Sequence, residues 1–159
     1  MMSKKKSIES TVTGSSYKIP SANCKSKNLV YCAECLLCQK QYTGKTTNKL
    51  QQRISGHRSH VNRPPDELPK PEDTDEATLA EHLNLVHNMD SVELFNLSYS
   101  FTVLQLEPRN IDKCEQKWIS QLVTLEPYGL NKEKPCGVAD SILTMSKKVK
   151  SSSHFQRGR

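Results

Sequence analysis

Residues 31–58 read YCAECLLCQKQYTGKTTNKLQQRISGHR, and this stretch decides both the fold and the chemistry that we expect. Two tyrosine-bearing segments, 28–34 and 40–44, have the composition of β-strands, and the second ends at a glycine turn. The short CLLC connection between them predicts a hairpin. Apolar residues then recur at helical spacing over residues 50–61, so the stretch predicts a hairpin followed by a helix.

The rest of the chain predicts two more helices and a third strand. TLAE at Thr78–Glu81 is a capping box that opens a short helix, and the alternating, β-rich segment Ser98–Leu106 predicts a strand. The clearest helix is Asn110–Leu125. Its apolar residues form a stripe that we expect to be buried, made of Cys114, Trp118, Leu122 and Leu125. The predicted class is α+β, with a small three-stranded antiparallel sheet flanked by helices.

The charge is uneven along the 159 residues. The net charge of +6 divides into +3 in residues 1–20, +5 in residues 141–159 and −2 in residues 21–140. Both ends are polar and basic, and we expect them to be flexible, disordered tails around a single domain at 21–140, so that their removal leaves folding intact. Such tails suit either loose phosphate contact or simple solvation. The acidic, proline-rich segment 64–78 is expected to be an exposed insertion without helix or strand.

The sequence has no apolar run long enough to span a bilayer, and its N-terminus has no apolar signal-peptide core. We therefore expect an intracellular protein without a membrane partner. In that setting, six cysteines favour metal or catalytic roles over a disulfide framework.

The spacing of two ligand pairs predicts a structural zinc site. Cys35 and Cys38 form a C-x-x-C, and His82 and His87 form an H-x4-H. A site of this kind would staple the hairpin to the later helix, from which a small core gains stability. The competing interpretation is two buried thiols and two surface histidines, and Cys32 is an alternative ligand.

A second group of residues suits an anionic ester. Gly44 permits close backbone approach, Lys45 is expected at the mouth of the following helix, and Arg53 and His57 share one face of that helix. Glu115 borders the apolar stripe of its helix and is expected to face inward, where it could hold a metal ion. Each residue taken alone is better explained by core packing or a solvated helix face, whereas the residues together, in this order, favour a site.

In this order and spacing, the motifs resemble the GIY-YIG endonuclease family. The resemblance covers about residues 28–131 and rests on Tyr31, YTG (Tyr42–Gly44), Lys45, Arg53, His57, CEQKWI with Glu115, and GLN ending at Asn131. The embedded cysteine pair and the later EHLNLVH resemble the variant of that family carried by Penelope-like retroelements. The first motif here is LVY, so only its tyrosine is kept, and Thr43 replaces an isoleucine.

The resemblance implies a Mg²⁺-dependent DNA endonuclease that hydrolyses phosphodiester bonds. By that resemblance, Glu115 would bind Mg²⁺ and Tyr31 would activate or position the attacking water. Tyr42 and Lys45 would orient the phosphate, and Arg53 would meet its developing charge. His57 would help to hold the scissile phosphate, and Asn131 would complete the far wall of the site.

The resemblance also sets expectations about partners. DNA is the expected partner, with no small-molecule substrate, a nuclear location, and a reverse transcriptase module in the parent element. The alternative function is a catalytically decayed or host-adopted DNA-binding module that keeps the zinc-stabilised fold. The retention of Tyr31, Tyr42, Arg53 and Glu115 favours the enzyme.

Overall fold

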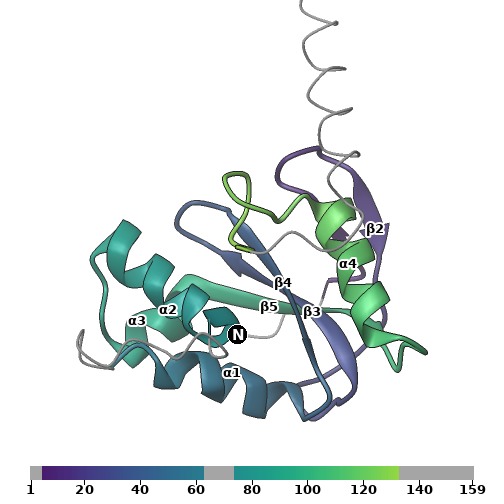
Figure 1. Ribbon diagram of the computed structural model, residues 1–159, viewed down its shortest axis with the longest axis horizontal. Coiled ribbons are helices and arrows are strands. Elements are labelled where there is room, and N and C mark those ends of the chain that lie inside the picture. Colours follow the sequence, from purple (N-terminus) through teal and green to yellow (C-terminus); the bar gives the residue numbers. More distant parts are fainter. Residues whose placement is uncertain (1–4, 63–73, 133–159) are drawn as a thin grey trace, which may run out of the picture.

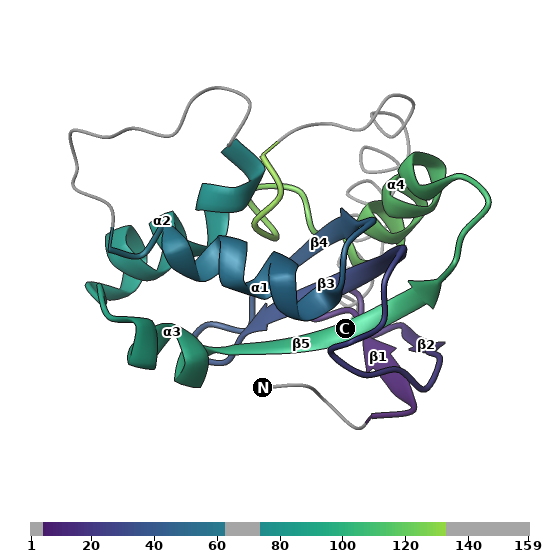
Figure 2. The same cartoon turned by 90° about the horizontal axis from the view of Figure 1, so that it is seen from below.

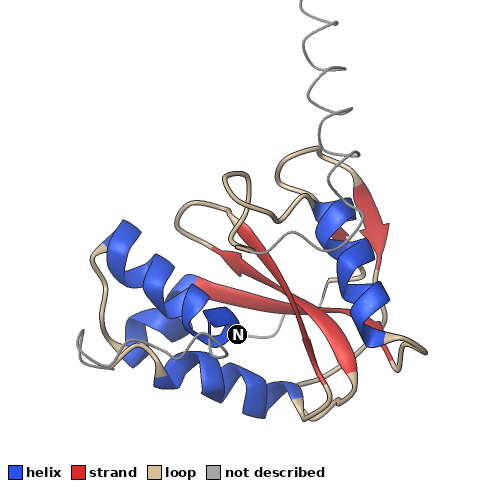
Figure 3. Ribbon diagram, viewed as in Figure 1, coloured by secondary structure: helices blue, strands red, loops and turns tan. Residues whose placement is uncertain are grey.

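The computed structural model describes residues 5–62 and 74–132, which form an α+β fold with helices on both faces of a small antiparallel sheet (Figure 1, Figure 3). None of the helices in this part of the chain is long and apolar enough to cross a membrane. In chain order the elements are β1 (Ser7–Glu9), β2 (Ser16–Lys18), β3 (Leu29–Cys35), β4 (Gln41–Thr46), α1 (Leu50–Ser59), α2 (Thr74–His87), α3 (Val92–Ser98), β5 (Tyr99–Leu106) and α4 (Ile111–Leu122).

The central sheet has the order β4-β3-β5, and both strand pairs are antiparallel. This confirms the predicted fold class and the three predicted strands. In the β3–β4 hairpin, Tyr31 lies opposite Gly44 and Ala33 lies opposite Tyr42. Both tyrosines therefore point to the same face of the sheet, because residues paired across a hairpin share a face.

Strand β3 is covered on both faces, and alternate residues enter two separate cores. Tyr31, Ala33 and Cys35 pack into the larger core with residues of α1, α2 and α3. Val30 and Cys32 pack into the smaller core with residues of α4 and the first hairpin. Figure 2 shows α1 and α4 on opposite sides of the sheet. A residue's parity on β3 thus decides which helices its side chain meets.

Helix α4 has the predicted buried face but ends earlier than predicted. Asn110 caps its start by accepting a hydrogen bond from the Lys113 amide at 2.9 Å, and Cys114, Trp118 and Leu122 are buried. The helix was expected to reach Leu125. It ends at Leu122 because Val123 adopts a left-handed conformation with φ 57°, which terminates helices.

The prediction that residues 1–20 form a disordered tail is wrong for residues 7–18. This segment forms the β1–β2 hairpin, which packs against α4 (Figure 1). Ile8 is buried, and the Ser10 hydroxyl donates to the Leu122 carbonyl at 2.8 Å. Tyr17 meets Trp118 edge to face. Only a few apolar residues anchor this hairpin, so its composition resembles that of a tail.

The expected boundaries around the second helix also need correction. Helix α2 begins at Thr74, four residues before the predicted cap at Thr78, so the end of segment 64–78 is helical. The short helix α3 was not predicted, although Ser91 caps it by accepting from the Leu94 amide at 3.1 Å. The rest of the expected insertion, 64–73, and the expected tail 141–159 lie outside the described residues.

The burial of Ile8 generates a prediction about stability. Ile8→Ala should lower the free energy of unfolding by about 2–4 kcal/mol, because it removes a side chain packed beside Val30 and Trp118. Val12→Ala, in the same hairpin but 42% exposed, should change it by less than about 0.5 kcal/mol. Urea denaturation measures both. An effect of Ile8→Ala as small as that expected for Val12→Ala would show that the hairpin does not contribute to the cooperative fold.

Candidate functional site

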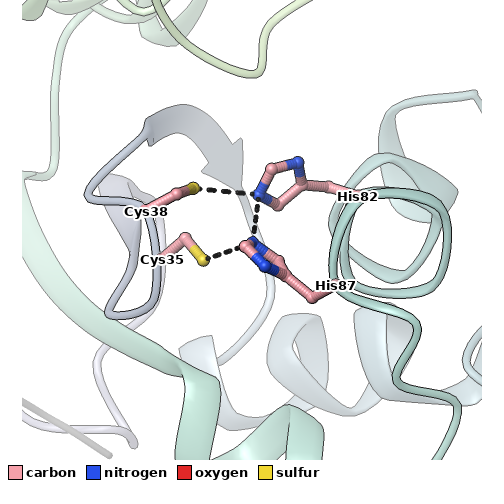
Figure 4. A group of neighbouring side chains, drawn as sticks. All are labelled: Cys35, Cys38, His82 and His87. Atoms are coloured by element: carbon pink, nitrogen blue, oxygen red, sulfur yellow. Dashed lines mark hydrogen bonds between the residues drawn. The ribbon is translucent and has the colours of Figure 1, made fainter.

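The hairpin tip and helix α2 bring four metal-ligand residues together, as the sequence spacing predicts. Cys35 ends β3, Cys38 lies in the turn before β4, and His82 and His87 lie on α2. Figure 4 shows the two thiols facing the two imidazole rings across the gap between hairpin and helix. The turn is tight, since the Gln39 amide donates to the Cys35 carbonyl at 2.7 Å. That closure turns both sulfur atoms toward the helix.

The spacing of the four ligand atoms matches a tetrahedral metal site. Nε2 of His87 lies 3.5 Å from Cys35 Sγ, Nε2 of His82 lies 3.3 Å from Cys38 Sγ, and the two Nε2 atoms are 3.2 Å apart. All four atoms lie within 4.8 Å of one another. Zinc–sulfur and zinc–nitrogen bonds of about 2.3 and 2.0 Å place tetrahedral ligands about 3.3–3.8 Å apart. The cluster can therefore hold a metal ion such as zinc.

Burial changes the protonation of two residues in the cluster. Burial, with help from His87, lowers the pKa of His82 to about 4, so its imidazole is neutral at physiological pH. Burial also raises the pKa of the Cys35 thiol. A metal ion shared by the four residues would displace the thiol protons and bind all four ligand atoms.

Cys32 is not part of this cluster. Its side chain lies on the α4 face of β3, the opposite face from Cys35, and it is almost fully buried. Burial raises the pKa of the Cys32 thiol well above its usual range. Cys32 is therefore a core residue, and the alternative in which it replaces one of the four ligands is wrong.

Three of the residues expected in the catalytic site form a hydrogen-bonded chain on the α1 face. The Tyr31 hydroxyl lies 2.7 Å from Nε2 of His57 and accepts from Nε of Arg53 at 3.2 Å. The i, i+4 spacing on α1 brings both side chains to the same strand residue. The tautomer of His57 decides which of the two donates; with Nδ1 protonated, Nε2 can accept the Tyr31 hydroxyl proton. Tyr42 joins the group through its ring, 5.8 Å from that of His57.

Gly44 makes room for this arrangement. A Cβ atom at this position would lie 2.6 Å from the Tyr31 hydroxyl oxygen and 2.8 Å from a ring carbon of Tyr42. Contacts that short are far inside van der Waals distance. The glycine of the YTG segment is therefore required by the packing of two tyrosines over the strand, more than by a turn conformation.

Lys45 and Glu115 form an ion pair on the other face of β4. The Lys45 ammonium lies 2.7 Å from Glu115 Oε2 and 2.8 Å from Asp112 Oδ1. Partial burial opposes the charge, but the two carboxylates together raise the pKa of Lys45. The expectation that Lys45 lies at the mouth of α1 is wrong, since it contacts α4. Glu115 faces inward as expected, with its side chain 15% exposed.

Asp112 was missed from the sequence, although its position contains the signal. It precedes Glu115 by three residues, a spacing that places two helical side chains on one face. In the structure it shares the ammonium of Lys45 with Glu115. Lys45 directly follows Gly44, so the ion pair and the Tyr31 chain meet neighbouring residues of β4.

Asn131 has a position different from the expected wall of an open site. Its side-chain oxygen accepts from the Thr43 amide at 2.9 Å, and its side-chain nitrogen donates to the Thr43 carbonyl at 2.8 Å. Asn131 is buried, and so is Thr43. It therefore holds the backbone of the YTG segment in place. His57 is also fully buried, which leaves it in contact with Tyr31 rather than at a surface where a phosphate would lie.

No protein-family model, curated protein or solved structure matches this chain. The candidate sites therefore rest on the geometry described above and on the order of the motifs.

The cluster of cysteines and histidines predicts the metal content of the protein. Wild-type protein should carry one metal ion per chain, and Cys38→Ser should lose it, as measured by elemental analysis. Cys38 is exposed, so its substitution removes a ligand without opening the core. The melting temperature should fall by about 5 °C or more, since each kcal/mol is worth about 2–4 °C in a domain of this size.

Cys24→Ser is the matched control, because Cys24 lies outside the cluster. It should keep the metal and the wild-type melting temperature. Wild-type protein without metal, and as stable as Cys38→Ser, would show that these cysteines are ordinary thiols.

Proposed function

We propose that the chain is a Mg²⁺-dependent DNA endonuclease of the GIY-YIG type, with a structural zinc ion in the variant typical of Penelope-like retroelements. The observation that carries the proposal is the chain Arg53–Tyr31–His57, packed against Gly44 one residue before the Lys45–Glu115 pair. A nucleic-acid-binding module has no need of a buried tyrosine between a guanidinium and an imidazole. A hydrolase that must move a proton has such a need.

In this proposal Tyr31 takes a proton from the attacking water and His57 receives the tyrosine proton. The hydrogen bond from Arg53 Nε stabilises negative charge on the tyrosine oxygen, and His57 Nε2 lies 2.7 Å away to accept the proton. His57 thus acts on Tyr31 and does not touch the phosphate, which differs from the role that the resemblance implies. Its complete burial fixes the ring for that transfer.

Arg53 connects this proton path to the substrate. It is half-buried, whereas Tyr31 and His57 are fully buried, so an approaching phosphate meets Arg53 first. A guanidinium can contact a phosphate and a hydroxyl with different N–H groups. We propose that Arg53 stabilises the charge that develops on the phosphate and that its shift toward DNA admits water to Tyr31. Lys45 would contact a neighbouring part of the DNA backbone from the other face of the edge strand β4.

The carboxylates beside Lys45 fit a Mg²⁺ ion. Mg²⁺ is held in proteins by one or two carboxylates together with substrate phosphate and water, and Glu115 is a largely buried carboxylate with Asp112 beside it. When bound, the ion would supply positive charge for the phosphate and the leaving oxygen. The Lys45 ammonium already places a positive charge beside Glu115. When Mg²⁺ binds Glu115, Lys45 would release this carboxylate and contact a DNA phosphate instead.

For the Cys35, Cys38, His82 and His87 cluster we propose zinc as the metal. Two thiolates and two imidazoles at tetrahedral spacing suit zinc, whereas Mg²⁺ prefers oxygen ligands. Protein atoms fill all four positions, so the ion would be structural. Zinc should therefore bind the cysteines and histidines, and Mg²⁺ should bind the carboxylates beside Lys45.

Glu115→Gln should abolish nicking of supercoiled plasmid in the presence of Mg²⁺ while DNA affinity stays within about threefold of wild type. The amide keeps the shape of the side chain but removes the charge that a hard cation requires. Glu126→Gln, an exposed acid away from the site, should nick at the wild-type rate. Equal nicking by Glu115→Gln and wild type would refute the proposed role of the carboxylate.

Arg53→Ala should slow nicking by roughly 10²-fold or more, the usual effect of removing a donor from transition-state charge. Arg58→Ala is the matched control, because Arg58 lies on the same helix and contacts Ser55 and Asn96 at the surface. It should have a small effect. Similar losses in both variants would indicate a general contribution of positive charge to DNA binding.

A second candidate function is a DNA-binding module that has lost cleavage. The Lys45–Glu115 ion pair supports it, because it occupies the carboxylate oxygen that a catalytic metal would need. Wild-type protein that binds DNA but does not nick it with Mg²⁺, under conditions where its zinc is retained, would favour this candidate. Plasmid nicking that depends on Glu115 would exclude it.

A further inference from the structure

A cavity of about 550 Å³ lies at the β5 edge of the sheet, away from the residues of the proposed catalytic site. Lys5 and Lys6 line one side, residues 19–24 line another, and Thr102 and Val103 of β5 line a third. Both lysines are exposed, while Ile19 is half-buried and Val103 is buried. The volume falls within the range of small-molecule sites, and the wall combines an apolar part with positive charge.

The walls of the cavity are fixed by packing on both faces of the sheet. We call residues 19–27 the strap. Ile19 packs against the core beside α4, and Ala22 packs against the core beside α1, so the strap passes around the β5 edge from one face to the other. The Ile19 amide also donates to the Lys6 carbonyl at 3.1 Å. The strap and the lysine segment are therefore joined on one side of the cavity.

The strap also bonds to the first turn of α1, the helix that carries Arg53 and His57. The Cys24 carbonyl accepts from the Gln51 amide and the Ser26 carbonyl accepts from the Leu50 amide, both at 2.9 Å. These bonds satisfy amides in the first turn of α1, which the helix itself leaves without partners. The strap thus links the cavity to the start of the proposed catalytic helix.

Exposed lysines line and flank the cavity, which favours an anionic ligand. Residues 5–62 contain ten lysines and arginines and two acids, a net charge of +8. Residues 74–132 contain four basic and nine acidic residues, a net charge of −5. The strap adds Lys25 and Lys27, both exposed, between the cavity and α1. Lys5, Lys6, Lys25 and Lys27 would therefore attract an anionic polymer to the cavity and the strap.

We propose that this cavity binds one unpaired nucleotide of a single-stranded DNA segment that runs along the strap, away from the cleavage site itself. The base would enter the apolar part beside Val103 and Pro20, and the two phosphates that flank a nucleotide within a strand would meet Lys5 and Lys6. Duplex backbone would contact such lysines at the surface but leave a cavity of this size unfilled. The inference rests on the proposed function, from which it takes DNA as the partner.

The test uses the full chain with Glu115→Gln to prevent cleavage, and it measures binding of fluorescent oligo(dT) and of a matched duplex by anisotropy. Ser21→Trp fills the cavity from an exposed wall position without changing charge. It should weaken oligo(dT) binding about tenfold or more and change duplex binding by less than about twofold. Ser16→Trp, at an exposed position on β2 outside the cavity, is the control and should leave both unchanged.

A second variant tests the lysines through salt dependence. Lys5→Ala with Lys6→Ala should reduce the slope of log affinity against log salt for oligo(dT) by about 1.4, which is about 0.7 for each lost phosphate contact on a single strand. Lys18→Ala with Lys117→Ala removes two exposed lysines outside the cavity and should leave that slope near its original value. Thermal melting confirms that each variant folds.

Oligo(dT) binding by Ser21→Trp at the wild-type affinity, or an unchanged slope in the Lys5/Lys6 variant, would overturn the inference. An equal loss of oligo(dT) and duplex binding in Ser21→Trp would also overturn it, because the cavity would then serve duplex DNA. The proposed function is tested separately by plasmid nicking with wild-type protein. If wild-type protein nicks plasmid but Ser21→Trp binds oligo(dT) normally, only the cavity proposal is refuted. If Ser21→Trp selectively loses oligo(dT) binding but wild-type protein does not nick plasmid, only the proposed enzyme activity is refuted.

Discussion

The burial of β3 on both faces is the constraint on which the rest of the structure depends. Because side chains alternate along a strand, Tyr31 and Cys35 must lie on one face and Cys32 on the other. Four residues along a strand span about 13 Å, so the hydrogen-bonded group around Tyr31 and the metal cluster around Cys35 are two separate sites on the same face. A shift of one residue in register would place Cys32 toward α2 and remove Tyr31 from His57.

Strand β4, the second strand of the hairpin, positions the residues of the candidate site. Gly44 allows the Tyr31 ring to lie across β4, and Asn131 holds the backbone of Thr43 between Tyr42 and Gly44. Lys45, the next residue, turns to the other face and meets α4. Two helices that are distant in sequence therefore deliver their charged groups to adjacent positions of one strand. The precision of the candidate site depends on buried backbone contacts as much as on the charged residues themselves.

Much of this arrangement could be predicted where one strong local pattern sufficed. The three strands of the central sheet follow from strand composition, and the metal cluster follows from the spacing of Cys35, Cys38, His82 and His87. The buried face of α4 follows from its helical periodicity. The N-terminal hairpin could not be predicted, because Ile8 and Tyr17 are held in place by packing with Trp118, which is distant in the sequence. Lys45 was misplaced for the same reason, since its partners on α4 are set by tertiary packing.

The metal cluster has a consequence for how the domain tolerates change in length. It joins Cys38 to His82, 44 residues apart, and the segment 64–73 lies within that span. The entropy of closing a flexible loop grows only slowly with length, by about 0.6 kcal/mol for each doubling. A metal ion bound there would fix the hairpin to α2 and so leave segment 64–73 open to insertion and deletion, while Tyr31 and Arg53 stay in register. In evolutionary terms, the cluster separates a part of the chain that is free to diverge from one that is not.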